Sequence, residues 1–363
     1  MRVILLILSF VGILYAQSVA RDYPSYRYVF SEFDVEPSFI DNEIFVKFVR
    51  ANERKIKLFY KRSIKRGEML LPILQRKLMD DGLSDLFVYL SMVESGFATD
   101  IVSSKKAVGL WQFMPATARS YKLRVCDTVD ERCDPDVATD AAIAHLEKLH
   151  KKFGKWYLAI MAYNCGEGRL GKAIAQSGSE SLEVLIGKES TLPRETRLYI
   201  QKILLAAMIG ESISLGFEQM PKSKGGKGVM RVTVNGGERW LDLAALLDMN
   251  ISALKRLNPA YKGDMLPKSD KHYDIYIPEE KIYAFYLRYE LEKHSKILQS
   301  DYLLPYEVKL GDTIEKIAKI YQSDPGSIKA ANHKKDEYLE VGEFLVIPVS
   351  KEIFETAQKG SRE

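Results

Sequence analysis

The chain of 363 residues exceeds the usual length of a single domain, so two or more domains are expected. Its hydrophobic content of 46% and charged content of 28% are ordinary for a soluble globular protein. A net charge of +4 is too small to indicate a nucleic-acid partner, although it is compatible with a polymer of mixed or negative charge.

The N-terminus has the pattern of an export signal. Arg2 precedes an apolar run from Val3 to Tyr15, and small residues follow between Ala16 and Ala20. This predicts a secretory signal peptide over residues 1–20, cut after Ala16 or Ala20, because the run is too short for a typical membrane span. No cysteine lies near this exit to carry a lipid anchor. We therefore expect a soluble protein of the periplasm or cell envelope, with an uncleaved anchor as the alternative.

The next part of the sequence predicts a helical domain over about residues 50–220. The segment 21–49 before it begins with an aromatic and polar stretch without clear periodicity, and we expect it to wrap around that domain. From Ile44 to Met79, apolar residues recur at helical spacing. Asp134 and Pro135 then suit a helix N-cap and first turn, so a helix is expected to Phe153, where Gly154 closes it.

A glutamate stands at the end of the most apolar stretch of this domain. Leu86 to Val93 is apolar on almost every face, so this stretch must be buried if it is helical, and Gly96 is a suitable helix stop. A carboxyl group at Glu94 would lose hydration, which raises its pKa and supplies the protonated form that a general acid needs. The alternative is an ordinary helix-terminal glutamate, solvated or paired with Arg or Lys.

Three further motifs follow in the same domain. Gly109-Leu110-Trp111-Gln112 offers the apolar face of a tryptophan and the donor and acceptor groups of an amide, which both suit a sugar. Trp156 to Asn164 predicts a second buried helix that ends in Tyr163-Asn164. Pro193 to Tyr199 leads into an apolar helix that should end near Ile213.

At these places the sequence resembles the lysozyme-like lytic transglycosylases of bacterial cell walls. The family's motifs occur in order as Glu94-Ser95, Gly109-Leu110-Trp111-Gln112, Ala162-Tyr163-Asn164 and Pro193-Arg194-Glu195-Thr196 with Tyr199. Trp111 and the C-terminal modules resemble the membrane-bound type D branch. The resemblance implies a multidomain protein with a mainly α, lysozyme-like catalytic domain followed by small modules.

The C-terminal part contains a βααβ unit that occurs twice. A basic linker, Pro221 to Gly228, precedes a first unit over 229–280, and a helical connector over 281–303 leads to a second unit over 304–350, followed by a tail over 351–363. The expected strands are Val229–Val234, Tyr273–Pro278, Tyr306–Leu310 and Phe344–Pro348. The expected helices of the first unit are Leu241–Leu247 and Ile251–Leu257. In the second unit, one helix should end at Tyr321 and the next near Asn332.

These units resemble LysM modules, which bind glycans that contain N-acetylglucosamine. The second copy carries the matching Gly311-Asp312-Thr313, so glycan binding is implied there. The first copy has Asn235-Gly-Gly-Glu238 instead, and a structural role as a spacer is at least as well supported for it.

The resemblance also implies a reaction. Glu94 would protonate the oxygen between N-acetylmuramic acid and N-acetylglucosamine and then accept a proton from the muramyl C6 hydroxyl, which closes a 1,6-anhydro ring without water. The residues implied to hold the substrate are Ser95, Ser103, Gln112, Tyr163, Asn164 and Tyr199. The other carboxylates near the motifs, Asp100, Glu167 and Glu195, are expected to be solvated or paired, Glu195 with an arginine. The alternatives are a hydrolytic muramidase of the goose type and a non-catalytic wall-binding scaffold.

The cysteines and histidines give no pattern of a metal site, so no metal or other cofactor is expected. Cys126 and Cys133 lie seven residues apart in a polar loop and could form a disulfide in an oxidising compartment. Cys165 is interpreted as a small buried residue. His145 and His150 fall on an amphipathic helix, where solvated or capping roles are expected. The partner implied is the peptidoglycan glycan strand, and the sequence leaves the oligomeric state open.

Overall fold

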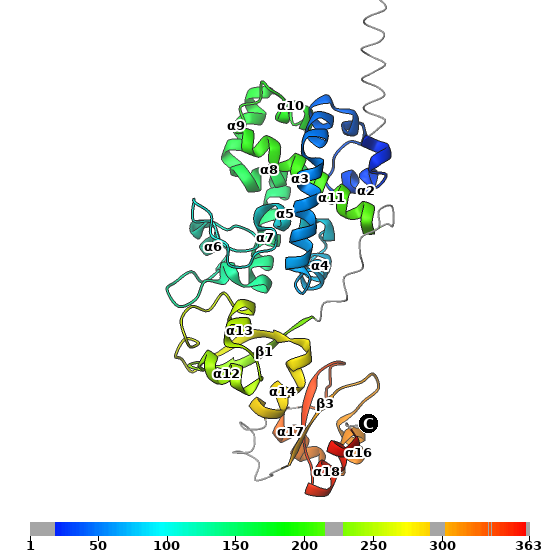
Figure 1. The fold of residues 1–363 in the computed structure, drawn as a ribbon, viewed down its shortest axis with the longest axis vertical. Helices are drawn as coiled ribbons and strands as arrows, with labels where there is room; N and C mark the ends of the chain where they lie inside the picture. The colour runs from blue at the N-terminus through cyan, green and yellow to red at the C-terminus, as the bar shows by residue number, and fades with distance from the viewer. Residues whose placement is uncertain (1–18, 215–227, 291–301, 333, 335, 361–363) are drawn as a thin grey trace, which may run out of the picture. The chain divides into compact units, whose positions relative to one another are not determined.

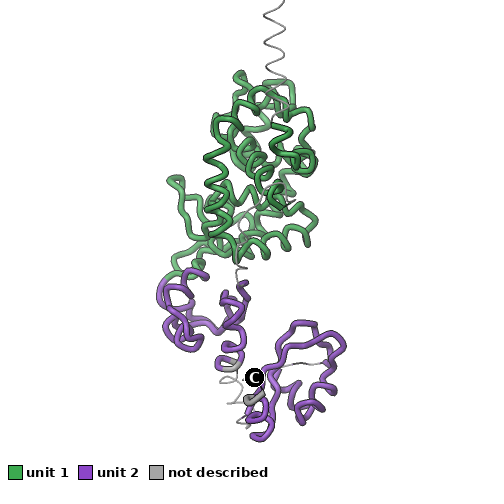
Figure 2. Tube along the Cα trace, turned by 45° about the vertical axis from the view of Figure 1, so that its right-hand side comes forward, with its two compact units in different colours: residues 1–226, 258–262 green, residues 227–257, 263–363 purple. Residues whose placement is uncertain are grey.

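We describe the protein from a computed structural model, whose described residues are 19–214, 228–290, 302–332, 334 and 336–360 (Figure 1). The chain divides into two compact units, one of Met1–Gly226 with Asn258–Lys262, the other of Lys227–Leu257 with Gly263–Glu363 (Figure 2). Almost all of the predicted signal peptide, most of the predicted linker and part of the predicted connector lie outside the described residues.

The first unit is built of helices, as the sequence predicts. Its described helices are α2 Tyr26–Glu32, α3 Glu43–Gly67, α4 Leu71–Asp80, α5 Val88–Ser95, α6 Pro115–Ser120, α7 Pro135–Phe153, α8 Trp156–Cys165, α9 Glu167–Ser177, α10 Leu182–Ile186 and α11 Arg194–Ser214. Short 3-10 turns, η1 Pro37–Asp41, η2 Asp85–Phe87 and η3 Glu131–Cys133, connect some of them. Helix α11 packs against α3, α5 and α8, so it forms the centre of the unit (Figure 1).

The core of this unit explains why its helices lie where they do. Leu90 and Met92 of α5 and Ile203 and Leu204 of α11 are fully buried. Helix α7 begins where Asp134 accepts hydrogen bonds from the next backbone N–H groups, at 2.9 and 3.3 Å, and ends at Gly154 with a φ of 73°. These caps and the apolar character of α5 and α11 confirm the sequence-based expectation of a mainly helical domain.

The N-terminal segment differs from the expectation, because it builds the core as well as wrapping it. Phe30 is fully buried, and its ring lies 6.1 Å from that of Phe39 and 6.0 Å from that of Phe45. Its helical elements α2 and η1 have 7 and 5 residues. Elements of this length hold fewer than two turns, so an apolar period was not visible in the sequence.

The second unit contains the two predicted βααβ repeats. The first repeat consists of β1 Val229–Asn235, α12 Trp240–Leu246, α13 Ile251–Leu257 and β2 His272–Pro278. The second consists of β3 Leu303–Glu307, α16 Ile314–Ile320, α17 Pro325–Ala331 and β4 Phe344–Pro348. Between them lie η4 Glu279–Lys281, α14 Ile282–Phe285 and the π-helical η5 Tyr286–Glu290. In each repeat the two strands pair antiparallel.

Two expectations for the second repeat need correction. Strand β3 ends at Glu307 and not at Leu310, because Lys309 and Asp312 form a turn there and Leu310 is 90% exposed. The tail forms helix α18 Lys351–Gly360, and Ile353 and Phe354 pack against the core of this repeat. Among the described residues, no helix is both long enough and apolar enough to span a membrane.

Candidate active site

Glu94 occupies the last turn of α5, where the chain stops the helix sharply. The next glycine, Gly96, has a φ of 60° and donates its N–H to Met92 O at 2.7 Å. A Cβ at this position would lie 2.9 Å from Arg66 Nη1 and 3.1 Å from Ser63 Oγ. Glycine is therefore required both by the left-handed backbone and by the close approach of α3. The predicted helix stop is confirmed.

The environment of Glu94 keeps a large fraction of its carboxyl group protonated at neutral pH. Burial raises its pKa from 4.5 to about 7. Tyr199 of α11 opposes this shift, since its hydroxyl donates to Glu94 Oε1 at 2.5 Å and stabilises the charged form. The charge of Glu195 raises the pKa further, and that of Lys202 lowers it. A group of this pKa can both donate and accept a proton near pH 7.

Two phenol side chains lie near this carboxyl group, Tyr199 buried and Tyr163 half-buried. Tyr199 and Tyr163 both have pKa values raised well above the usual range, by burial first and then by the charge of Glu94. Tyr163, from the end of α8, donates its hydroxyl to Trp111 O at 2.8 Å. Because both phenols stay protonated, they act as neutral hydrogen-bonding groups beside the acid and not as bases.

Asn164 links the two helices that carry these phenols. Its Oδ1 accepts a hydrogen bond from Thr196 Oγ1 of α11 at 2.8 Å. This bond fixes the orientation of the side-chain amide, so Nδ2 is the end that can donate to a substrate carbonyl. The structure thus brings Glu94, Tyr163, Asn164 and Tyr199 together from α5, α8 and α11, as the motifs predict.

The side-chain amide of Gln112 hydrogen-bonds within its own loop, and its role in binding substrate stays a prediction. It adopts a φ of 50°, and its Nε2 donates to Gly109 O at 2.9 Å and to Ile101 O at 3.2 Å. These bonds close the loop that precedes α6, and they leave Oε1 as the acceptor end of the amide. Ser103 also shapes this loop, because its Oγ accepts the N–H of Ala107 at 2.9 Å.

Two residues expected at the sugar-binding surface lie in the interior. Trp111 is fully buried, and its Nε1 donates to Thr139 Oγ1 at 2.9 Å, so its face is not available to a sugar. Ser95 is buried too and donates back to Ser91 O at 3.2 Å. The exposed apolar side chains near Gln112 are instead Ile101, Val102 and Met114, and the sequence analysis did not predict a role for them.

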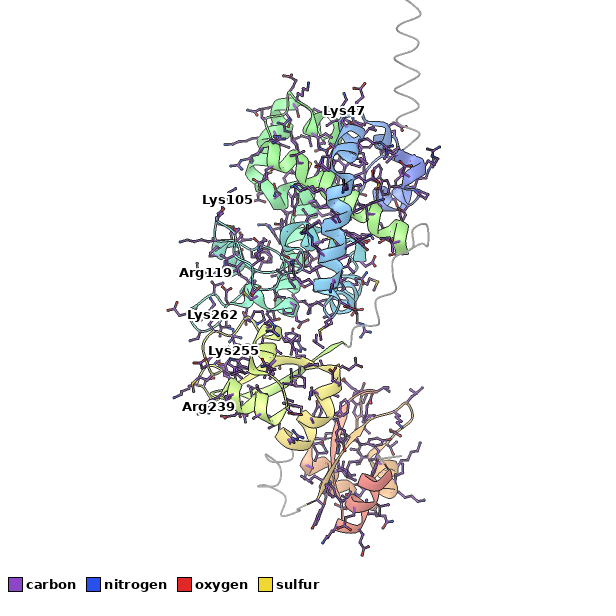
Figure 3. The ribbon with its side chains drawn as sticks, viewed as in Figure 1. Lys47, Lys105, Arg119, Arg239, Lys255 and Lys262 are labelled. Atoms are coloured by element: carbon purple, nitrogen blue, oxygen red, sulfur yellow. The ribbon has the colours of Figure 1, made fainter. Side chains whose placement is uncertain are left out.

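The other carboxylates near the motifs are paired with a lysine or exposed to solvent. Asp100 lies at the surface. Glu167 pairs with Lys152 at 3.2 Å, and that hydrogen bond and charge lower its pKa. Glu195 lies 3.7 Å from Lys105, so its partner is a lysine and not the expected arginine. Lys105 is labelled in Figure 3. None of these three groups shares the buried environment of Glu94.

His145 differs from its expected solvated or capping role. Its Nδ1 lies 2.9 Å from the Tyr121 hydroxyl, and its ring lies 5.1 Å from that of Tyr163. Burial lowers its pKa to about 4, so the ring is neutral at pH 7. The neutral His145 ring therefore packs against the ring of Tyr163. Its spacing of four residues from the buried Ala141 on α7 is the signal that could have placed it on the inner face.

The predicted disulfide is wrong, because Cys126 and Cys133 are both free. The Cys126 side chain is exposed beside Thr128, whereas Cys133 ends η3 and is buried, which raises its pKa to about 12. The two thiols face different environments although they are close in sequence. Within the described ranges, no group of three or more His, Cys, Asp or Glu residues could hold a metal ion.

The predicted glycan-binding motif of the second repeat shapes a turn. Asp312 Oδ2 accepts from Lys309 N and from the Tyr306 hydroxyl, each at 2.7 Å. Thr313 caps α16 by accepting from Lys316 N at 3.3 Å, and Gly311 has a φ of 88°. Glycan binding at this turn stays a prediction.

Comparison with known proteins identifies three domain families along the chain. The transglycosylase SLT domain matches residues 72–186, the LysM-like domain of lytic transglycosylase MltD matches 229–294, and the LysM domain matches 306–348. Peptidoglycan transglycosylase gp16 of Escherichia phage T7 is 35% identical over 146 residues, which cover 39% of this chain and 10% of the phage protein.

Membrane-bound lytic murein transglycosylase D of Escherichia coli (strain K12) is 29% identical over 275 residues. The match covers 72% of this chain and spans 59% of the length of that relative. Among solved structures, the 70 kDa soluble lytic transglycosylase SLT70 of Escherichia coli aligns at 20% identity with a TM-score of 0.34, over 40% of this chain and 24% of that one. The chain thus contains a transglycosylase SLT domain, an MltD-type LysM-like domain and a LysM domain, and it is homologous to membrane-bound lytic murein transglycosylase D of Escherichia coli.

Proposed function

We propose that this protein is a peptidoglycan lytic transglycosylase that cuts the β-1,4 bond between N-acetylmuramic acid and N-acetylglucosamine, with Glu94 as its single acid and base. The observation that carries the proposal is the enclosed Glu94 carboxyl group, whose pKa is about 7 and which Tyr199 contacts. Most glycosidases use two carboxylates. Asp100, Glu167 and Glu195 do not supply a second one in a comparable environment.

The proposed reaction has two proton transfers through one group. Protonated Glu94 gives its proton to the glycosidic oxygen, the C1–O bond breaks, and N-acetylglucosamine leaves with a hydroxyl group. The muramyl 2-acetamido oxygen stabilises the positive charge that develops at C1. The ionised Glu94 then accepts the proton of the C6 hydroxyl, whose oxygen bonds to C1 and closes the 1,6-anhydro ring. Glu94 ends protonated, as it began, and no water is consumed.

The neighbouring groups suit the supporting roles in this reaction. Asn164 Nδ2, fixed by Thr196, can donate to the acetamido group. Tyr199 stabilises Glu94 while it is ionised between the two transfers, because its hydroxyl already donates to Oε1. Gln112 and Ser103 hold the loop that carries the exposed apolar residues beside the site, so their contribution to substrate binding is largely indirect.

The LysM repeat suits a role in attachment. Its proposed partner is the glycan strand of the cell wall, at the turn formed by Gly311, Asp312 and Thr313, and the proposed location is the periplasm or cell envelope. A tethered binding module raises the local concentration of substrate without taking part in bond cleavage.

Product analysis separates this proposal from its rivals. Purified sacculi would be digested in water labelled with 18O, and the soluble fragments analysed by mass. The expected product carries 1,6-anhydromuramic acid and no label. A free reducing end that carries the label would make the enzyme a hydrolytic muramidase, and the absence of any fragments would make it a binding scaffold.

The Glu94→Gln variant tests the role of the acid itself. Proton transfer by a positioned side chain contributes about 10²–10⁴ in rate, so the variant should lose at least that much activity and still bind sacculi. The matched control is Glu189→Gln, which removes an exposed carboxylate that is not among the groups acting on Glu94 and should stay active. Substantial activity in Glu94→Gln would contradict the assignment.

A further inference from the structure

A cavity lies between α3 and α11, with one lining residue from α5. Its volume is about 270 Å³. Apolar side chains form the floor of the cavity, and cationic side chains form its rim. The lining residues are Asn52, Lys55, Ile56, Phe59, Arg62, Val93, Lys202 and Ala206. The lining contains three cations and no acidic residue. Within the described ranges, none of the three cations forms an ion pair with a carboxylate.

The lining of the cavity includes a chain neighbour of Glu94 and a ring that lies close to the end of its helix. Val93, which precedes Glu94 on α5, is part of its lining, and Phe59 lies 3.2 Å from where a Cβ of Gly96 would be. Lys202 follows Tyr199 by three residues on α11, so the two side chains share one face of that helix. The charge of Lys202 acts on Glu94 directly. A group bound in the cavity would therefore lie next to the bond that Glu94 cuts.

The electrostatics of the whole helix favour an anion. Helix α3 carries nine lysines and arginines against two glutamates, a net charge of +7, whereas the entire chain carries +4. The positive charge of the protein is thus concentrated on this helix. Some of it is neutralised, as in the pair of Lys57 with Glu53 at 3.2 Å, but Lys55 and Arg62 face the cavity without such a partner among the described residues.

We propose that this cavity binds a carboxylate of the short peptide attached to the muramyl sugar, so that the enzyme recognises peptide-bearing glycan. The inference rests on the proposed function for the identity of the ligand. Arg62 offers a planar fork that matches a carboxylate, while Lys55 and Lys202 supply point charges. The apolar floor of Ile56 and Phe59 limits hydration, which strengthens these interactions.

The size of the cavity also favours a peptide over a sugar. Pockets for drug-sized ligands hold about 300–1,000 Å³, and a volume of about 270 Å³ falls just below that range. One amino-acid residue with its carboxylate fits this space, whereas a disaccharide does not. The wall peptide is attached to muramic acid through a lactyl group on the sugar, so it can reach a site beside the cut bond.

The experiment compares two double variants of the intact chain. Lys55→Gln with Arg62→Gln removes two cations from the cavity. Lys61→Gln with Lys65→Gln removes two exposed cations from the same helix that do not line the cavity, so it is the matched control. Release of soluble fragments would be measured on sacculi with intact peptides and on glycan strands stripped of peptides by an amidase.

The expected result depends on both the variant and the substrate. The cavity variant should lose at least 10-fold in kcat/KM on peptide-bearing glycan and be unchanged on stripped glycan, while the control is unchanged on both. An equal loss on both substrates, no loss on either, or an equal loss in the control would overturn the proposal. Circular dichroism of all variants should match that of the unmodified chain.

A binding measurement keeps this proposal separate from the proposed function. A free peptide of L-alanine, D-glutamate and a diamino acid contains no sugar and cannot be cleaved by the proposed reaction. Calorimetric titration should show saturable binding to the intact chain and to the control, at least 10-fold weaker binding to the cavity variant, and weaker binding of the amidated peptide. Binding without cleavage of any glycan would refute the proposed function and leave the cavity site standing. If the peptide does not bind, the proposed cavity site is refuted. This holds whether or not the chain binds phosphatidylglycerol vesicles.

Discussion

Replacing Glu94 by glutamine should stabilise the protein, and it should do so much more at alkaline than at acid pH. A carboxyl group whose pKa is raised in the folded state binds more protons folded than unfolded in the interval between the two pKa values. For Glu94 these values are about 7 and 4.5. Stability is therefore lost as the pH rises from about 4.5 to about 7, and the full cost is present above that interval.

The size of the change in the free energy of unfolding follows from the pKa shift of Glu94. One pKa unit corresponds to about 1.4 kcal/mol, so a shift from 4.5 to about 7 costs roughly 3 kcal/mol at pH 8. At pH 5, only slightly above the unfolded pKa, little of this free energy has yet been lost, and the cost is below about 1 kcal/mol. Glutamine has no charge to bury, so the free energy of unfolding of Glu94→Gln relative to the parent should rise by about 2–3 kcal/mol between these pH values.

Denaturant unfolding at pH 5 and pH 8 tests this value. The transition of the first unit can be followed by fluorescence, since Trp111 and Trp156 both belong to it. Any hydrogen bond that glutamine loses contributes equally at both pH values and cancels in the comparison. Glu189→Gln is the control, because that exposed carboxylate is not among the groups that act on Glu94, so the variant should show no such pH dependence. A difference between parent and Glu94→Gln that is the same at both pH values would refute the buried, protonated carboxyl group.

Three other predictions concern single features. Tyr199→Phe removes a hydrogen bond to ionised Glu94, worth about 1.5–3 kcal/mol, so kcat should fall about 10–100-fold, whereas Tyr157→Phe, whose hydroxyl donates to a backbone carbonyl elsewhere, should stay active. Thiol titration of the unreduced protein should find Cys126 reactive in the folded state and Cys133 only after unfolding, and an absence of either thiol would contradict the free cysteines. A chain truncated near residue 300 should bind sacculi far more weakly and turn over short soluble glycans as before, and equal binding would exclude the LysM repeat as the anchor.

The sequence allowed the helices and the buried position of the candidate acid to be predicted where local chemistry decides them. Capping by Asp134 and Gly154 depends on residues adjacent in sequence, so the bounds of α7 were predictable. Glu94 was identifiable because an apolar run ends on a carboxylate and glycine. The βααβ repeats were predictable for the same reason, since their strands and helices alternate within about 50 residues.

Features that depend on tertiary contacts could not be predicted in this way. Trp111 has the residue type of a sugar platform, and only its hydrogen bond to Thr139, 28 residues away, places it inside. The pairing of Cys126 with Cys133 was plausible from spacing, but burial of one thiol and exposure of the other separates them. The cavity under Arg62 is formed by α3, α5 and α11 together, and no stretch of sequence indicates it.

In the proposed reaction one carboxyl group acts twice, and burial, Tyr199 and Lys202 together set the pKa that this requires. Burial alone would hold the proton too firmly for the group to give it up readily. Tyr199 and Lys202 both favour the ionised form, and with them the pKa stays at about 7. An anion bound in the cavity would offset the charge of Lys202 and so raise the pKa of Glu94, which favours the protonated form before the first transfer. Occupation of the cavity would in this way prepare the acid for cleavage of the adjacent bond, and glycan without peptide would meet an acid that is more often ionised.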